Sequence, residues 1–363
     1  MKLRLIAFTI LAFTGYGLSE DHAVPHAGHG DDSHIANQTS ALLPTDTVLI
    51  PTESNRDLYR PTRCDKNGNI YFRAYESEDR KIPVTRVDAK GATLKYTIDS
   101  DADFAKGASY DFSVLPNGNL YRPVQVGQDV YLVAYDHNAN ILWKTKLEKQ
   151  FWISHLTALS DESFLVSGVE IHGLVDGVRP PPKLFVALFD HQGKIVRRLD
   201  LEKDTASAEQ TSQSKGAATK EPIVLPAIEG DAQAGPDGNI YWMLRSESPV
   251  VDVLNQSGKV IRSFSVTPPG RHMVPISMSL GDGKLAIFFR GSFRGMPTSM
   301  TGMPGMERMK GIVSVVNAAG GTVIANYIVG PEFSEAMACY QGNTFVFVVP
   351  EKNNLAIQFA MAK

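Results

Sequence analysis

The 363-residue sequence contains few cysteines and few tryptophans, and neither basic nor acidic residues are in large excess. Two cysteines and three tryptophans occur, and 36 basic against 39 acidic residues give a formal charge of −3 at pH 7. A chain without a basic surplus lacks the electrostatic footprint of a nucleic-acid-binding protein, so we expect no nucleic-acid partner. The sequence also lacks a Cys-x-x-Cys pair, a Walker loop, a nucleophile elbow and a zinc-protease helix, so no such motif indicates an enzyme class.

Long apolar runs are absent after the first 20 residues, so we expect no membrane span in the mature protein. The N-terminus has the three parts of a secretory signal: a basic start, an apolar run from Leu5 to Phe13, and small residues up to Ser19. The apolar run is too short to anchor the chain across a bilayer. We therefore predict a signal peptide at 1–19 and a secreted or periplasmic protein.

Residues 20–45 are predicted to form a disordered, His-rich tail. The segment is polar and small, so it buries too little apolar surface to offset the loss of chain entropy. Its histidines are His22, His26, His29 and His34. Histidine-rich tracts also hold transition metals, which leaves a metal-binding tail as the alternative to a solvated one.

A repeated turn motif determines the predicted architecture. In each copy an apolar strand leads into a turn rich in Asn, Asp and Gly, and a second apolar strand follows. The copies centre on Gly68, Gly118, Glu162, Gly238, Gly283 and Gly342. Asn-Gly and Asp-Gly pairs supply the positive φ angles that two-residue hairpin turns require. A second hairpin follows each of the first five copies, with turns that begin at Asp88, Asp136, Asp190, Asn255 and Asn317.

Two hairpins make four strands, and repeats of this kind spaced by about 45 residues are typical of β-propeller blades. The sixth unit has room for three strands only, and Asp46–Pro51 is the candidate for its missing outer strand. Pairing that strand into the last blade leaves no open edge. We predict an all-β fold over residues 46–363: a six-bladed β-propeller with four-stranded antiparallel blades, the last blade closed by the N-terminal strand.

The two cysteines occupy nearly matching places in the first and last units. Cys64 lies four residues before its turn and Cys339 lies three before its own, on inner strands that neighbour each other across the closure. In an oxidising compartment a disulfide there would stabilise the fold by roughly 4–5 kcal/mol on the chain-entropy model. The one-residue offset can instead turn the side chains apart and leave two separate thiols.

The turns, above all the segment 236–242 (Pro-Asp-Gly-Asn-Ile-Tyr-Trp), resemble those of NHL-type, streptogramin-lyase-like and gluconolactonase-like six-bladed propellers. The resemblance covers the chain from about residue 46 to its end and concerns the hairpins. It implies the propeller architecture. That group includes calcium-dependent lactonases, lyases and interaction modules, so the resemblance implies no single activity and transfers no catalytic residue.

The long insertions are predicted to lie at one end of the blades, where second strands lead to third strands and each blade leads to the next. They span residues 173–183, 203–221 and 291–310. Long loops on a rigid scaffold are the usual location of binding residues.

A partial ring of ionisable side chains is predicted at the same end, where the inner strands begin. Its members are Asp111, His155, Asp231 and Glu335, with Arg63 further along the first inner strand and His272 at the start of the fifth unit. Three carboxylates and an imidazole suit a divalent cation, with calcium or magnesium favoured by the oxygens and zinc or manganese by the histidine. The same groups suit general acid–base chemistry, and charged residues also occur at wet channel mouths without any function.

The insertion at 291–310 is unusually rich in methionine, with side chains spaced by three or four residues. They are Met296, Met300, Met303, Met306 and Met309. Thioethers are soft ligands that suit Cu(I), which makes copper binding one interpretation. Methionine also adapts to irregular surfaces, so contact with a partner is the other.

Three functions remain open on this sequence. The first is an exported, monomeric propeller that binds an envelope or extracellular protein, or a small ligand, on its insertion-bearing face. The second is a metal-dependent hydrolase or lyase with its site at the channel mouth, with calcium as the first candidate cation. The third is a copper-binding envelope protein that uses the methionine-rich loop and the His-rich tail.

Overall fold

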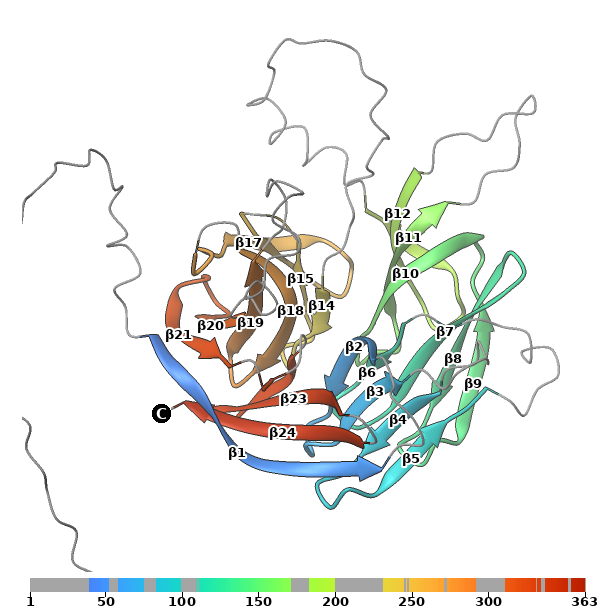
Figure 1. Cartoon of the computed structure of the whole chain (residues 1–363). Helices are drawn as coiled ribbons and strands as arrows, with labels where there is room; N and C mark the ends of the chain where they lie inside the picture. Colours follow the sequence, from blue (N-terminus) through green and yellow to red (C-terminus); the bar gives the residue numbers. More distant parts are fainter. Residues whose placement is uncertain are drawn as a thin grey trace, which may run out of the picture. The chain divides into compact units, whose positions relative to one another are not determined.

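All helices and strands assigned in the described part of the chain are β-strands, joined by turns and irregular segments, as the computed structural model shows (Figure 1). The structure describes residues 39–51, 58–74, 83–98, 109, 111–170, 183–199, 231–244, 246, 248–270, 273–291, 311–330, 332–333, 337–351 and 354–362. Within these ranges no helix has the length and apolar character needed to cross a membrane.

Four separate antiparallel sheets of four strands follow one another along the chain, each in simple chain order. The first holds β2 (Leu58–Cys64), β3 (Ile70–Ala74), β4 (Val84–Val87) and β5 (Thr93–Tyr96). The second holds β6 (Ser113–Val114), β7 (Leu120–Val126), β8 (Asp129–Tyr135) and β9 (Ile141–Lys146). The third holds β10 (Phe151–Ala158), β11 (Phe164–Glu170), β12 (Lys183–Phe189) and β13 (Ile195–Arg198). The fourth holds β14 (Asp231–Ala234), β15 (Ile240–Met243), β16 (Val250–Leu254) and β17 (Val260–Ser265).

The remaining strands form one eight-stranded sheet in the order β18-β19-β20-β21-β1-β24-β23-β22. One half consists of β18 (Met273–Gly281), β19 (Lys284–Gly291), β20 (Gly311–Asn317) and β21 (Val323–Val329). The other half consists of β22 (Met337–Gln341), β23 (Thr344–Glu351), β24 (Asn354–Ala362) and β1 (Thr39–Pro51). The fold is therefore all-β and propeller-like with four-stranded antiparallel blades, as the turn repeat predicts.

Strand β1 joins the two halves of the eight-stranded sheet. Its first residues, Thr39 to Ala41, pair in parallel with β21. From Leu42 to Pro51 it pairs antiparallel with β24, beside which it runs in Figure 1. The predicted pairing of residues 46–51 with the last strand of the chain is thus present. The strand begins seven residues before the predicted boundary, because Leu42 is buried in a hydrophobic cluster and so belongs to the folded part.

The first strands of successive blades contact one another, so we call them the inner strands. Contacts run from β2 to β6, β10, β14, β18 and β22 in turn, and from β22 back to β2. Hydrophobic clusters fill the spaces between consecutive blades. For example, Tyr121 of the second blade packs on Phe164 of the third with ring centroids 5.5 Å apart. Burial between blades is the main source of stabilisation, because each sheet covers its neighbour's apolar face.

The inner hairpins use two turn types, which corrects the expectation of two-residue turns throughout. In the inner turn of the first blade, between Cys64 and Ile70, only Gly68 has a positive φ (77°), and its N–H donates to the carbonyl of Asp65 at 3.1 Å. This is a type I turn followed by a left-handed residue. In the third blade Glu162 takes the same role with φ 62°. Asp282-Gly283 and Gly342-Asn343 are two-residue turns, with both φ values positive.

The two ends of the blades differ in their connections. The turns between the first and second strands and between the third and fourth strands lie at one end, which we call the turn end. At the other, the insertion end, Phe151 pairs with Glu170 and Glu170 pairs with Lys183, so the insertion after Glu170 starts and finishes there. The inner strands begin at this same end. The predicted placement of the insertions beside the inner-strand starts therefore agrees with the register.

Candidate functional site

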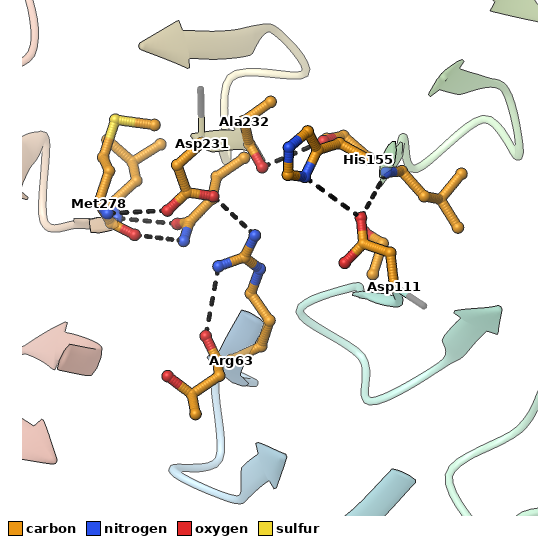
Figure 2. Close-up of polar contacts among 12 residues, drawn as sticks. Arg63, Asp111, His155, Asp231, Ala232 and Met278 are labelled. Carbon is orange, nitrogen blue, oxygen red and sulfur yellow. Dashed lines mark hydrogen bonds and ion pairs between the residues drawn. The ribbon is translucent and has the colours of Figure 1, made fainter. Parts of the chain in front are cut away.

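The structure brings four of the predicted site residues together (Figure 2). Arg63 lies on β2, His155 on β10 and Asp231 at the start of β14, while Asp111 lies just before β6. The four residues come from four different blades. We call them the inner polar cluster.

Arg63 and Asp231 form the strongest interaction of the cluster. A guanidinium nitrogen (Nη2) of Arg63 lies 2.7 Å from Oδ1 of Asp231, and the two side chains are only 14% and 10% exposed. The second carboxylate oxygen of Asp231 accepts the backbone N–H of Met278 at 2.8 Å. Both oxygens of Asp231 are therefore occupied, one by a cation and one by the next inner strand.

Asp111 and His155 form a second contact. Oδ2 of Asp111 accepts the backbone N–H of Leu156 at 2.6 Å and lies 3.8 Å from Nδ1 of His155. Oδ1 of Asp111 is buried and has no hydrogen-bond partner in the described part of the chain. Burial raises the pKa of Asp111, while His155 and Arg63 nearby lower it. The His155 side chain is 42% exposed, so its outer ring edge is open to solvent.

Both aspartates belong to a pattern that counting along the sequence did not reveal. In this pattern a polar side chain of one inner strand bonds to the backbone of the next; we call these contacts lateral bonds. Further examples are Ser113 Oγ with Ala158 N (3.0 Å), Thr157 Oγ1 with Ala232 O (3.0 Å), Gln233 Oε1 with Leu280 N (3.1 Å) and Ser279 Oγ with Tyr340 N (2.9 Å). The cluster thus helps to join neighbouring blades, whatever else it does.

β-bulges interrupt several inner strands close to the cluster. Register shifts leave Ser154 unpaired on β10, Ile276 on β18 and Ala338 on β22. A bulge re-aims the side chains that follow it, and bulges are frequent beside binding sites. His155 comes directly after one. It lines a small recess together with Thr157, Leu165, Ser167, Ala232 and Trp242.

An exposed tryptophan near the insertion end is a feature that the sequence did not single out. Trp152 lies on β10, three residues before His155, and its surface is 56% exposed. Its neighbour Phe151 is fully buried in the core between the second and third blades. The strand alternation that buries Phe151 therefore directs Trp152 outward, which explains its exposure.

The metal hypotheses gain no support from the described residues. In the ranges that the structure describes, no three His, Cys, Asp or Glu side chains are grouped so that they could hold an ion. In addition, the guanidinium of Arg63 already pairs with Asp231. The predicted site residues Glu335, His272 and the methionines from Met296 to Met309 lie outside the described residues, as do the signal peptide and the histidines of the tail.

Comparisons with known proteins give the architecture only. No family model and no curated protein match the chain. Among solved structures it is similar to virginiamycin B lyase from Staphylococcus aureus (13% identity, 88% of this chain and 94% of that one, TM-score 0.44). It is also similar to a Bacteroides caccae protein of unknown function (11%, 79% and 94%, TM-score 0.45) and to the Dos1 propeller (11%, 85% and 82%, TM-score 0.39). The predicted resemblance to streptogramin-lyase-like propellers therefore holds at the level of architecture.

Proposed function

We propose that the protein is an exported six-bladed β-propeller that binds a partner protein or a small ligand at its insertion end. The export proposal rests on the signal-like sequence at 1–19. The blade number and the binding end rest on separate observations, which follow.

The packing between the two halves of the eight-stranded sheet supports counting them as two blades. Phe288 of β19 and Phe347 of β23 pack edge to face with centroids 6.4 Å apart, inside a cluster that lies between the halves. Ser279 of β18 makes a lateral bond to Tyr340 of β22, as inner strands of separate blades do. Only the parallel pairing of Thr39–Ala41 with β21 merges the halves into one sheet. This packing supports a count of six.

The observation that carries the binding proposal is Trp152. A large aromatic side chain removes much apolar surface from water when a partner covers it. Tryptophan is also strongly enriched among the residues that dominate binding energy. Trp152 is exposed at the end where the insertion after Glu170 starts, and on β10 it lies three residues before His155 of the inner polar cluster. An apolar anchor beside charged and hydrogen-bonding groups is the usual composition of a binding surface.

Photo-crosslinking tests the proposal with a matched control. A photoreactive phenylalanine analogue replaces Trp152 in one variant and Leu142 in another; Leu142 is a comparably exposed apolar residue (48%) on the outermost strand of its blade. The full-length proteins are expressed in their native host and irradiated. We expect a discrete crosslinked species, identified by mass spectrometry, from position 152 and not from 142. Equal labelling at both positions, or none at 152, would contradict the proposal for a protein partner.

The small-ligand form of the proposal has its own measurement. Trp152 is fluorescent, and the other described tryptophans are buried (Trp242) or partly buried (Trp143). A ligand library is therefore screened by fluorescence with the wild type and with Trp152→Phe. We expect saturable changes in the wild type that weaken in the variant. Changes that are identical in the two proteins would place the binding elsewhere.

A further inference from the structure

Cys64 and Cys339 lie together at the junction between the first and the last repeats. Cys64 is the final residue of β2 and Cys339 lies in β22, and these two inner strands contact each other. Cys339 is part of an apolar cluster of buried residues, and Cys64 packs against the same cluster. Both are free thiols in this structure. The two cysteines therefore lie on contacting inner strands and in one apolar cluster. A disulfide between them stays a prediction.

The different turn types account for the offset. The first repeat turns through a loop with one left-handed residue at Gly68, whereas the last turns through the shorter Gly342-Asn343 pair. Because the last turn is shorter, the strand position that matches Cys64 lies three residues before the turn glycine in the last repeat instead of four. A bulge at Ala338 also directly precedes Cys339.

The two thiols differ in their surroundings, which assigns them different chemical roles. Cys64 is partly exposed, and Cys339 is buried. The neighbouring Cys64 thiol raises the pKa of Cys339, and burial and the negative charge of Asp65 raise it further. A thiolate is the nucleophile in disulfide exchange, so the accessible Cys64 is the thiol that reacts first.

We propose that Cys64 and Cys339 are a redox modification site, which takes up a disulfide-bonded oxidant and closes into a reversible disulfide between the first and last repeats. The oxidant is a low-molecular-weight disulfide such as oxidised glutathione, or an oxidised dithiol protein.

The reaction proceeds in two exchanges that balance. The Cys64 thiolate attacks one sulfur of the oxidant, whose S–S bond breaks and whose other half leaves as a thiolate. Cys339 then loses its proton to solvent and attacks Sγ of Cys64. The mixed disulfide breaks and the second half of the oxidant leaves as a thiolate. Two protein thiols are oxidised and one external disulfide is reduced to two thiols.

The disulfide would connect Cys64 and Cys339, which are far apart in the sequence, where β2 and β22 are held together by non-covalent contacts. A lateral bond from Thr62 Oγ1 to the carbonyl of Met337, 3.4 Å long, joins the same two strands. The disulfide would hold this junction closed when such contacts break. The inference does not depend on the proposed binding function.

Thiol titration and intact-mass measurement test the site on the full-length chain. The protein is equilibrated in glutathione buffers from fully reduced to fully oxidised. We expect a single transition from two free thiols to none, with the loss of two hydrogens in mass and no glutathione retained. Two persistent thiols across the series, a doubly glutathionylated chain or a disulfide-linked dimer would each overturn the proposal.

Single substitutions test the order of attack. Cys339→Ser is expected to stop at a mixed disulfide with one glutathione on Cys64. Cys64→Ser is expected to react many times more slowly, because its remaining thiol is buried. Equal rates in the two variants would refute the assigned roles. A third test uses the wild type alone, so that it does not depend on the folding of either serine variant. Its urea midpoint is expected to rise on oxidation and to return on reduction. A fall on oxidation would contradict a disulfide that fits this structure.

Discussion

Replacing Asp231 by alanine tests whether the inner polar cluster holds the blades together. The carboxylate pairs with Arg63 at 2.7 Å and accepts the N–H of Met278 at 2.8 Å, so both partners lose their counterpart at once. A metal- or ligand-binding residue with no structural role would be removed at almost no cost in stability. A residue that carries a lateral bond would not.

The structure allows the cost of Asp231→Ala to be estimated. Leaving the Met278 N–H without an acceptor costs about 1–3 kcal/mol. Breaking a buried ion pair by removing one partner costs about 3–5 kcal/mol, most of it from the charge left unpaired. Because the two penalties overlap and both side chains keep slight exposure, we expect a total of about 3–5 kcal/mol. Asp231→Asn should cost less than Asp231→Ala, because its amide oxygen still accepts the N–H of Met278, although both variants leave the charge of Arg63 without its counterion.

Urea unfolding followed by circular dichroism measures these values, and a double-mutant cycle separates them. Arg63→Met is made alone and with Asp231→Asn. Removing both charges should cost less than the sum of the single changes, with a coupling of about 0.5–3 kcal/mol. A destabilisation by Asp231→Ala of less than about 1 kcal/mol, or additive single changes, would refute the reasoning.

Three further predictions concern the turns, the buried carboxyl and the N-terminal strand. Gly68→Ala should lower the free energy of unfolding in urea by about 1–2 kcal/mol. Its positive φ alone accounts for this cost, since an added Cβ meets nothing within 4 Å. Gly320 is equally open but has no positive φ, so Gly320→Ala should change stability by less than about 0.5 kcal/mol. The pKa of Asp111 is raised in the folded state. The neutral carboxyl therefore stabilises the fold fully below about pH 4, and this contribution to the free energy of unfolding is lost as pH rises through the folded pKa. Urea midpoints of Asp111→Asn relative to the wild type should therefore increase with pH, and a flat difference would contradict the assignment. Deleting residues up to 51 should give aggregated protein on size exclusion, whereas a chain that starts at residue 39 should stay soluble, because only the first exposes the edge of β24.

The architecture could be predicted because its signal is local. Each inner turn needs a left-handed residue at one position, and glycine adopts that conformation without strain, so Gly68, Gly118 and Gly238 reveal the repeat directly. The less regular copies are informative for the same reason. Glu162 occupies the glycine position with φ 62°, so a sequence search for glycine alone would miss that turn.

The roles of the site residues could not be predicted in the same way, because they depend on contacts between blades. The spacing placed Asp111 and Asp231 at the starts of inner strands, but nothing in it indicated that each carboxylate accepts an N–H about 45 residues further on. The repeat period itself contains that signal, since residues one period apart lie on neighbouring inner strands. Bulges such as the one at Ser154 then alter the register by one residue, which a count along the sequence cannot anticipate.

The occupied oxygens restrict what a ligand can meet at this end of the molecule. Both oxygens of Asp231 are engaged, and Oδ2 of Asp111 is held by Leu156. A cation arriving between the carboxylates would have to displace Arg63 and would give up the 2.7 Å pair. The exposed groups on β10 that take no part in the lateral bonds are the side chains of His155, 42% exposed, and Trp152, 56% exposed, and these are the groups left for a ligand to bind. The geometry therefore favours a polar or anionic group attached to an apolar or aromatic body over a bare metal ion, and competition by calcium for such a ligand would contradict this inference.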